Sequence, residues 1–438
     1  MTKRHGYALL SAFVALVVAF SATMLIRSAA GDSSPGSTAT GRGSHGSSAA
    51  TWVGSWAASP VGAEPGTGPT GLAGHSVRNV VHANTSGTSA RVTLSNLYGR
   101  TPLTITHASV ALSAGRGTAA ARAETMRRLK FDGAYAVTIP AGQQVRSDAV
   151  RIAVPRDSDV LVTTYAVAPS GPVTYHPHAR QISYVAKGDR TEESTGVPYT
   201  EQTSSWRYLT ALDVLTEEAH GTVVAFGDSI TDGISSTTGE NHRWPDVLAS
   251  RLRSAAGHRT DAPRYSVVNE GISGNRVLTA GPGSPAQNPS GLSRFDRDAL
   301  GHANVKVVVI DLGVNDILRS KSPGDRDKIL DGLRTLVRQA HARGLKVVGA
   351  TLTPFQGRKA WTPAREEMRR QINAEIRSGR VFDAVVDFDN ALKDPAAPQR
   401  LLPAYDSGDH LHPSDVGYRK MADIFNLRLL EGAGQTEL

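Results

Sequence analysis

Short apolar runs separated by turn residues fill the sequence between residues 51 and 215. The runs alternate apolar and polar positions or are rich in β-branched residues, and Gly and Pro mark the breaks between them. No long stretch there has the spacing of an amphipathic helix. The pattern predicts a β-rich, sandwich-like N-terminal domain over residues 51–215. Its clearest predicted strands are residues 90–97, 136–139, 150–154 and 160–167.

The pattern changes in the second half, which we assign to a domain at residues 219–438. Strand-like apolar runs now alternate with segments of helical period, such as the face formed by Trp244, Leu248 and Leu252. This alternation predicts a parallel sheet with helices on both sides, an α/β fold. The apolar runs are residues 223–226, 267–268, 305–310, 347–352 and 385–388. Ligands of open parallel sheets bind beyond the carboxyl ends of the strands, so those positions are the candidates for chemistry.

The first residues resemble an export signal. Lys3 and Arg4 precede an apolar stretch at residues 7–26, and Ser28 and Ala30 form a small-x-small cleavage site. We therefore expect residues 1–30 to be a signal peptide and the protein to be secreted and extracellular. If the segment is not cleaved, it would act as an anchor and be the chain's sole membrane contact. Residues 31–50 are almost entirely small and polar, which predicts a flexible linker.

Charge and cysteine content exclude several classes of function. The chain has 48 Lys and Arg against 40 Asp and Glu, a formal net charge of +8, but the basic residues are interspersed with acidic ones. We therefore expect no nucleic-acid partner. Cysteine is absent, which rules out disulfides, thiolate zinc sites and a cysteine nucleophile.

Three candidate groups follow successive predicted strands. Ser229 lies in a Gly-Asp-Ser turn that leads into a helix; by itself such a turn is more often a plain helix cap, and it differs from the G-x-S-x-G elbow of α/β-hydrolases. Gly274 follows the second strand, where it allows close approach of the backbone to a ligand. Asn315 follows the third, where its amide can donate a hydrogen bond, although an isolated Asn there is usually an Asx turn.

A fourth group lies near the C-terminus, where Asp409 and His412 precede a helix that begins around Ser414. When two residues separate an aspartate from a following histidine, the carboxylate can fix the imidazole tautomer, so that the other ring nitrogen faces a serine. We prefer His412 to His410 as the base because it completes this spacing. A metal site is the competing explanation, but no further His-rich spacing supports it, and we expect neither metal nor cofactor.

These four groups, in this order, resemble the sequence blocks of the SGNH hydrolase superfamily, also called the GDSL esterase/lipase family. The resemblance covers residues 222–430. It implies a flavodoxin-like three-layer α/β/α domain, a nucleophile at Ser229 and an oxyanion hole formed by Ser229, Gly274 and Asn315. It further implies a catalytic Asp409–His412 pair. Secreted bacterial members with a β-rich N-terminal region also share the motif at residues 52–60.

The resemblance implies an ester hydrolase that acts through an acyl-enzyme without a cofactor. The expected partner is a small or polysaccharide-linked acyl ester, either an acylated carbohydrate or a short- to medium-chain lipid ester. An acyltransferase of the same fold remains an alternative. So does a polysaccharide-binding surface protein with a vestigial hydrolase domain. In the β-rich half, His176 and His178 flank a proline, which favours a turn over a metal site.

Overall fold

Two antiparallel sheets form the β-rich half. The computed structural model describes residues 49–68, 70–257, 262–281, 288–320, 322 and 325–432, so the predicted export segment and all but the last two residues of the predicted linker lie outside the described residues. One sheet has the order β1-β16-β4-β10, with β9 paired to β4; the other has the order β14-β13-β3-β11-β6-β7. The strands of the first sheet are β1 (Thr51–Ala57), β16 (Leu209–Thr216), β4 (Gly87–Ser95), β10 (Val150–Val154) and β9 (Gln144–Arg146). Those of the second are β14 (Glu201–Thr203), β13 (Ser183–Lys187), β3 (His75–Ala83), β11 (Ser158–Ala166), β6 (His107–Leu112) and β7 (Arg127–Arg128).

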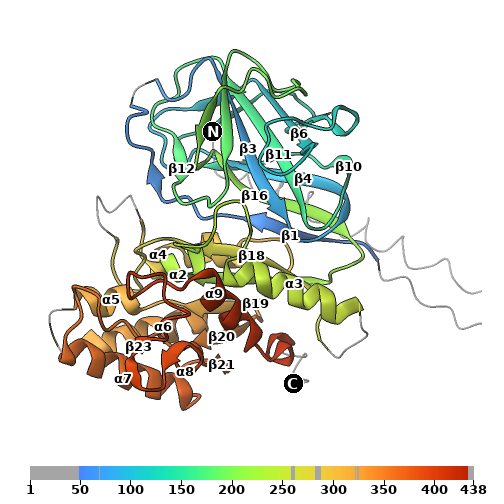
Figure 1. Cartoon of the computed structure of the whole chain (residues 1–438). Helices are drawn as coiled ribbons and strands as arrows, with labels where there is room; N and C mark the ends of the chain where they lie inside the picture. Colours follow the sequence, from blue (N-terminus) through green and yellow to red (C-terminus); the bar gives the residue numbers. More distant parts are fainter. Residues whose placement is uncertain are drawn as a thin grey trace, which may run out of the picture. The chain divides into compact units, whose positions relative to one another are not determined.

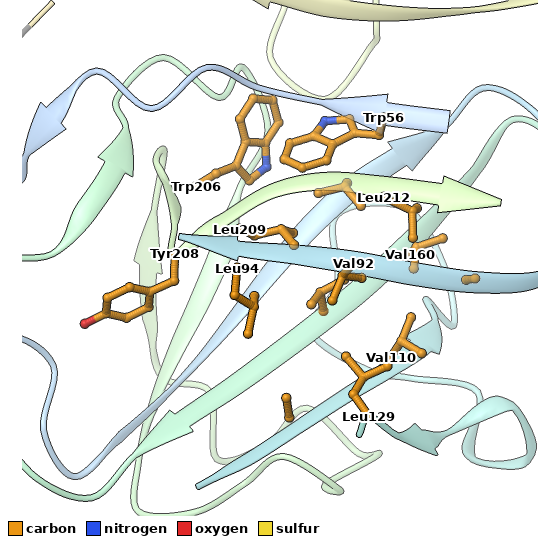
Figure 2. Close-up of a cluster of buried hydrophobic side chains, with 14 of the residues drawn as sticks. Trp56, Val92, Leu94, Val110, Leu129, Val160, Trp206, Tyr208, Leu209 and Leu212 are labelled. Atoms are coloured by element: carbon orange, nitrogen blue, oxygen red, sulfur yellow. The ribbon is translucent and has the colours of Figure 1, made fainter. Parts of the chain in front are cut away.

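The core of this half lies between the two sheets, because each strand turns alternate apolar residues inward. Figure 2 shows Trp56 beside Trp206, with ring centroids 4.8 Å apart in an edge-to-face arrangement. Val92, Val110 and Val160 extend the same cluster. Smaller pairings complete the half, with β15 (Trp206–Arg207), β12 (Thr174–His176) and β2 (Gly62–Ala63) in one sheet, β5 (Leu103–Ile105) paired with β8 (Val137–Ile139), and the short helix η1 (Ala123–Thr125).

A five-stranded parallel sheet forms the second half, in the order β18-β17-β19-β20-β21. From β17 the chain first adds β18 on one side, and then adds β19, β20 and β21 in turn on the other side. The order of the strands therefore reverses between β17 and β19, although all five strands are parallel. This is the order of flavodoxin-like folds, whose ligands bind at the point of reversal. The strands are β17 (Gly221–Gly227), β18 (Tyr265–Gly271), β19 (Val305–Asp311), β20 (Lys346–Ala350) and β21 (Ala384–Val386).

Helices cover both faces of the parallel sheet, as Figure 1 shows. One core contains apolar residues of α3 and α9, and the other contains those of α4, α6 and α7, because alternate residues of β17 point to opposite faces. The predicted three-layer α/β fold preceded by a β-rich domain is confirmed. The helices are α2 (Ser229–Asp232), α3 (Trp244–Gly257), α4 (Gly291–Phe295), α5 (Val314–Arg319), α6 (Asp325–His341), α7 (Pro363–Arg377), α8 (Phe388–Leu392) and α9 (Asp415–Asp423). A π-helical turn η2 (Asp296–Leu300), the short helix η3 (Leu427–Leu430) and the hairpin β22 (Lys393–Asp394) and β23 (Ala397–Leu401) complete the half.

The two halves pack directly against each other, and Ala49–Leu438 form one compact unit. The Gly54 N–H in β1 donates to Thr222 Oγ1 at 3.1 Å. A Cβ on Gly54 would lie only 2.8 Å from Val268 in β18, so this approach requires a residue without a side chain. The predicted domain limits, residues 51–215 and 219–438, stay a prediction. Among the described residues, no helix has the length and apolar composition needed to cross a membrane.

Candidate active site

The predicted residues after the first three parallel strands converge at one edge of the sheet. Gly227 at the end of β17 is in register with Gly271 of β18 and Asp311 of β19. A Cβ on Gly271 would lie 2.2 Å from the backbone nitrogen of Asp232, so the second strand can end against α2 only as glycine. The loops that carry Ser229, Gly274 and Asn315 therefore begin side by side.

A sharp turn presents Ser229 at this edge. Ser229 is the first residue of α2, and the side chain of Asp228 caps that helix by accepting the Ile230 N–H at 3.0 Å. Gly233 ends the helix in the left-handed region, at φ +89°. One short helical turn with a cap at each end fixes the position of the hydroxyl.

His412 contacts this hydroxyl from the loop before α9. Its Nε2 lies 2.9 Å from Ser229 Oγ, and its Nδ1 lies 2.6 Å from Asp409 Oδ2. The other carboxylate oxygen of Asp409 accepts the backbone N–H groups of Leu411 at 3.0 Å and His412 at 2.8 Å. Because those two donors hold Oδ1, Oδ2 is directed at the imidazole, and the three predicted side chains form a continuous hydrogen-bonded chain.

The surroundings of His412, burial above all, favour its neutral form. Burial lowers the pKa of His412, and the cation of Arg358 lowers it further, while Asp409 opposes both; the net shift is downward. Arg358 donates to Asp409 Oδ2 at 3.0 Å. Burial raises the pKa of Asp409, but the backbone N–H groups and His412 outweigh burial, and the net shift is downward. A neutral imidazole next to an ionised carboxylate is the state that a general base requires.

His410, the histidine that we set aside, forms a separate pair. Its Nδ1 lies 2.7 Å from Asp406 Oδ2, and Asp406 Oδ1 accepts the backbone N–H of Gly408 at 2.8 Å and of His410 at 3.0 Å. The pair repeats the geometry of Asp409 and His412 but is not bonded to Ser229. The Asp-x-x-His spacing favoured His412 as the base, and the folded loop gives His410 a different partner.

The two remaining predicted oxyanion groups lie beside the nucleophile turn. Gly274 has φ +76°, a left-handed conformation that suits glycine. Asn315, in the first turn of α5, donates from Nδ2 to Asp228 Oδ2 at 3.2 Å. Burial, followed by the charge of Asp311, raises the pKa of Asp228, and the hydrogen bond from Asn315 opposes this shift.

Sequence analysis missed a buried arginine that joins the strand ends. Arg294 is fully buried, and its guanidinium donates to Gly227 O at 2.9 Å, Glu270 O at 2.8 Å and Asn275 Oδ1 at 3.0 Å. It also donates to Ser59 Oγ of the β-rich half at 2.9 Å. The sequence shows only that charges of both signs alternate around Arg294, and its i,i+4 spacing to Asp298 was the available signal of an ion pair.

The turn expected at His176 and His178 begins only at Pro177, where the chain bends after β12. His176 is the last residue of β12, is only 3% exposed, and pairs with the buried Asp232 of α2. No cluster of metal-ligating side chains occurs in the described part of the chain. The proline thus marked the end of the strand, but it gave no sign of the buried partner of His176.

Comparison with known proteins identifies the second half of the chain. The family profile described as the GDSL-like lipase/acylhydrolase family matches residues 225–420. No curated protein matches the chain. Among solved structures, the chain is similar to a lipolytic protein of the G-D-S-L family from Desulfitobacterium hafniense, with 22% identity over 48% of this chain and 98% of that one, at a TM-score of 0.36.

Two other similar structures carry names of esterases. An acetylxylan esterase from Geobacillus stearothermophilus is 22% identical over 49% of this chain and 95% of its own, at a TM-score of 0.36. A carbohydrate acetylesterase from Sinorhizobium meliloti is 18% identical over 47% and 96%, at a TM-score of 0.35. The family match covers both the Ser229 turn and the loop of His412. The domain that contains residues 225–420 therefore belongs to the GDSL-like lipase/acylhydrolase family of the SGNH hydrolase superfamily, a family of carboxylic ester hydrolases.

Proposed function

We propose that the protein is an exported serine esterase in which Ser229 is the nucleophile, His412 the general base and Asp409 the residue that orients the base. The observation that carries the proposal is the 2.9 Å contact between His412 Nε2 and Ser229 Oγ. A neutral imidazole at that distance accepts the hydroxyl proton as Oγ attacks an ester carbonyl. Export is proposed from the cationic and apolar pattern of residues 1–30.

The tetrahedral intermediate places a negative charge on the former carbonyl oxygen. We assign its hydrogen-bond donors as the N–H groups of Ser229 and Gly274 and the side-chain amide of Asn315. Donors fixed before the reaction stabilise such a charge without reorganising. His412 then returns the proton to the leaving alcohol. In the second half-reaction His412 takes a proton from water as the water attacks the acyl-enzyme, and Ser229 leaves with that proton as the acid is released.

Short acyl esters of carbohydrates are our proposed substrate class, with short- to medium-chain lipid esters as the alternative. Two of the similar structures are named as esterases of acetylated carbohydrates, which supports the first class. The chain has no cysteine and the reaction as written needs no cofactor.

Substitution of the nucleophile tests the proposal. Ser229→Ala should reduce hydrolysis of p-nitrophenyl acetate to background, since no other group then carries the acyl chain. Ser378→Ala is the matched control, because Ser378 is an exposed serine at the end of α7, and it should keep wild-type kcat/KM. Wild-type turnover by the purified Ser229→Ala protein would refute the assignment.

Substrate class needs a second measurement. The wild-type enzyme should be assayed on p-nitrophenyl esters of increasing chain length and on acetylated polysaccharides, with acetate release as the readout. Analysis of the products with and without a sugar acceptor distinguishes hydrolysis from acyl transfer. The carbohydrate assignment is wrong if long-chain esters are cleaved faster than acetylated polysaccharide and p-nitrophenyl acetate.

A further inference from the structure

An ion pair links the β-rich half to the helix that begins with the nucleophile. His176 ends β12 in the β-rich half, and its Nε2 lies 3.0 Å from Asp232 Oδ1. Asp232 is the last residue of α2, three positions after Ser229. The side chains are 4% and 2% exposed, so this contact is shielded from solvent.

The hydrogen-bond partners of His176 require a charged ring. Its Nδ1 lies 2.8 Å from the carbonyl oxygen of Ser59, and its Nε2 faces the carboxylate of Asp232. Both partners are acceptors, so both ring nitrogens must carry a hydrogen. Burial lowers the pKa of His176, but the charge and hydrogen bond of Asp232 together with the Ser59 carbonyl outweigh burial, and the net shift is upward. For Asp232, burial raises the pKa and His176 lowers it, with a net downward shift. Both shifts favour the ionised pair.

The second oxygen of Asp232 holds the loop that carries Gly274. Asp232 Oδ2 accepts the backbone N–H of Ser273 at 3.0 Å and the Ser273 hydroxyl at 2.5 Å. Ser273 is the residue directly before Gly274, so these bonds fix the peptide that leads into the proposed oxyanion donor. Asn269 adds a parallel link by donating to Thr231 O at 2.7 Å. One carboxylate therefore sets the distance between the nucleophile helix and the Gly274 turn.

We propose that His176 is a positioning residue for ester hydrolysis, which fixes Asp232 and, through Ser273, the Gly274 N–H relative to Ser229. On this proposal the β-rich half supplies part of the esterase site and is more than a separate recognition module. The inference rests on the proposed function, since it concerns how the oxyanion donors are held. His176 touches neither the nucleophile nor the base, so its action is through the loop.

A purely structural ion pair is the competing explanation, and stability separates the two. Buried ion pairs contribute little net stability because the cost of desolvation offsets their attraction, whereas they can select one arrangement of a loop. Misplacing a catalytic group by about 1 Å costs about 10²-fold in rate. A positioning role therefore lowers kcat far more than it changes KM, while a structural role lowers the amount of folded enzyme and leaves each folded molecule fully active.

The test uses the full chain with His176→Ala, His176→Gln and Asp232→Asn. Active sites are titrated with a fluorophosphonate that labels the serine, so that kcat is expressed per competent site. We expect His176→Ala to lower kcat about 10- to 100-fold with KM within about threefold of wild type. His176→Gln should recover part of kcat, because its amide nitrogen reaches roughly the position of Nε2 and donates to Asp232. Asp232→Asn should resemble His176→Ala.

His107→Ala is the matched control. His107 also belongs to the β-rich half and pairs with an aspartate, Asp189, but both side chains are substantially exposed, unlike the buried pair of His176 and Asp232. It should keep wild-type kcat. Should His176→Ala fail to fold, His176→Gln and Asp232→Asn decide the matter by the same readout.

Two outcomes are distinguishable. If the His176 and Asp232 variants show wild-type kcat per titrated site, the positioning role is refuted even where their melting temperatures fall, and the esterase assignment stands. If Ser229→Ala remains active, the proposed function fails first, and this inference falls with it.

Discussion

Replacing Asp409 with asparagine changes a single atom in the proposed triad, and the structure predicts which way the new amide turns. Asp409 Oδ1 accepts two backbone N–H groups, at 3.0 Å from Leu411 and 2.8 Å from His412, while Oδ2 faces His412 Nδ1 at 2.6 Å. In Asp409→Asn the amide oxygen should keep the two backbone donors, which are fixed by the loop. The NH₂ group then faces the imidazole. Arg358, which is 39% exposed, can move its guanidinium to solvent.

This orientation disables the base. An NH₂ group opposite Nδ1 requires Nδ1 to accept, which places the ring hydrogen on Nε2, directed at Ser229 Oγ. The reverse orientation would leave two backbone donors facing an NH₂ group, at a cost of about 1 to 3 kcal/mol. The variant also lacks the negative charge that stabilises the imidazolium, worth about 2 to 3 kcal/mol for a partly exposed pair. Together these give about 4 kcal/mol, or a fall in kcat/KM of about 10³-fold.

The assay is kcat/KM for p-nitrophenyl acetate at a pH where wild-type activity is maximal. Asp406→Asn is the matched control, because Asp406 has the same two types of partner, backbone N–H groups and a histidine Nδ1, but its histidine is not bonded to Ser229. It should stay within about threefold of wild type, as expected for a side chain outside the reaction. The reasoning is refuted if Asp409→Asn stays within tenfold of wild type, or if the control falls equally.

Two further predictions concern charge and stability. Arg358→Ala should move the acid limb of the pH profile of kcat/KM to higher pH. His412 acts as a base only when neutral, so the rate is lost as pH falls through the pKa of His412. The cation of Arg358 contributes to keeping that pKa low. A limb that moves to lower pH or stays in place would contradict this account. Arg294→Met should lower the free energy of unfolding by about 3 to 5 kcal/mol, measured by urea denaturation, because it leaves buried carbonyl groups and part of the Asp298 carboxylate without their partner. Arg370→Met, at an exposed pair, should change it by less than about 0.5 kcal/mol, and equal effects of the two substitutions would show that Arg294 adds nothing.

Local pattern was sufficient to predict the layers of the fold. Apolar runs of strand length alternate with helical faces after residue 219, and all five predicted runs contain strands of the parallel sheet. The last run was too long at its C-terminal end, since Phe388 begins α8 and only Ala384–Val386 form β21. Burial explains this difference, because an apolar residue is buried equally well at the start of a helix.

The order of the motifs along the chain was enough to name the candidate site residues. Three of the four groups follow strands, and the carboxyl ends of parallel strands meet at one edge of the sheet. The Asp-x-x-His spacing favoured His412 over His410 as the base, but it did not predict the partner of His410. Only the folded loop assigns one imidazole to Asp406 and the other to Ser229.

The contacts between halves were decided by tertiary structure alone. Ser59 and His176 lie far from Arg294 and Asp232 in the sequence, yet they meet as buried partners. A sequence displays the period of an element and the chemistry of a turn, since both depend on near neighbours. Which charged side chains become buried, and which partners they bind there, depends on how the two halves pack against each other. No local sequence pattern carries that information.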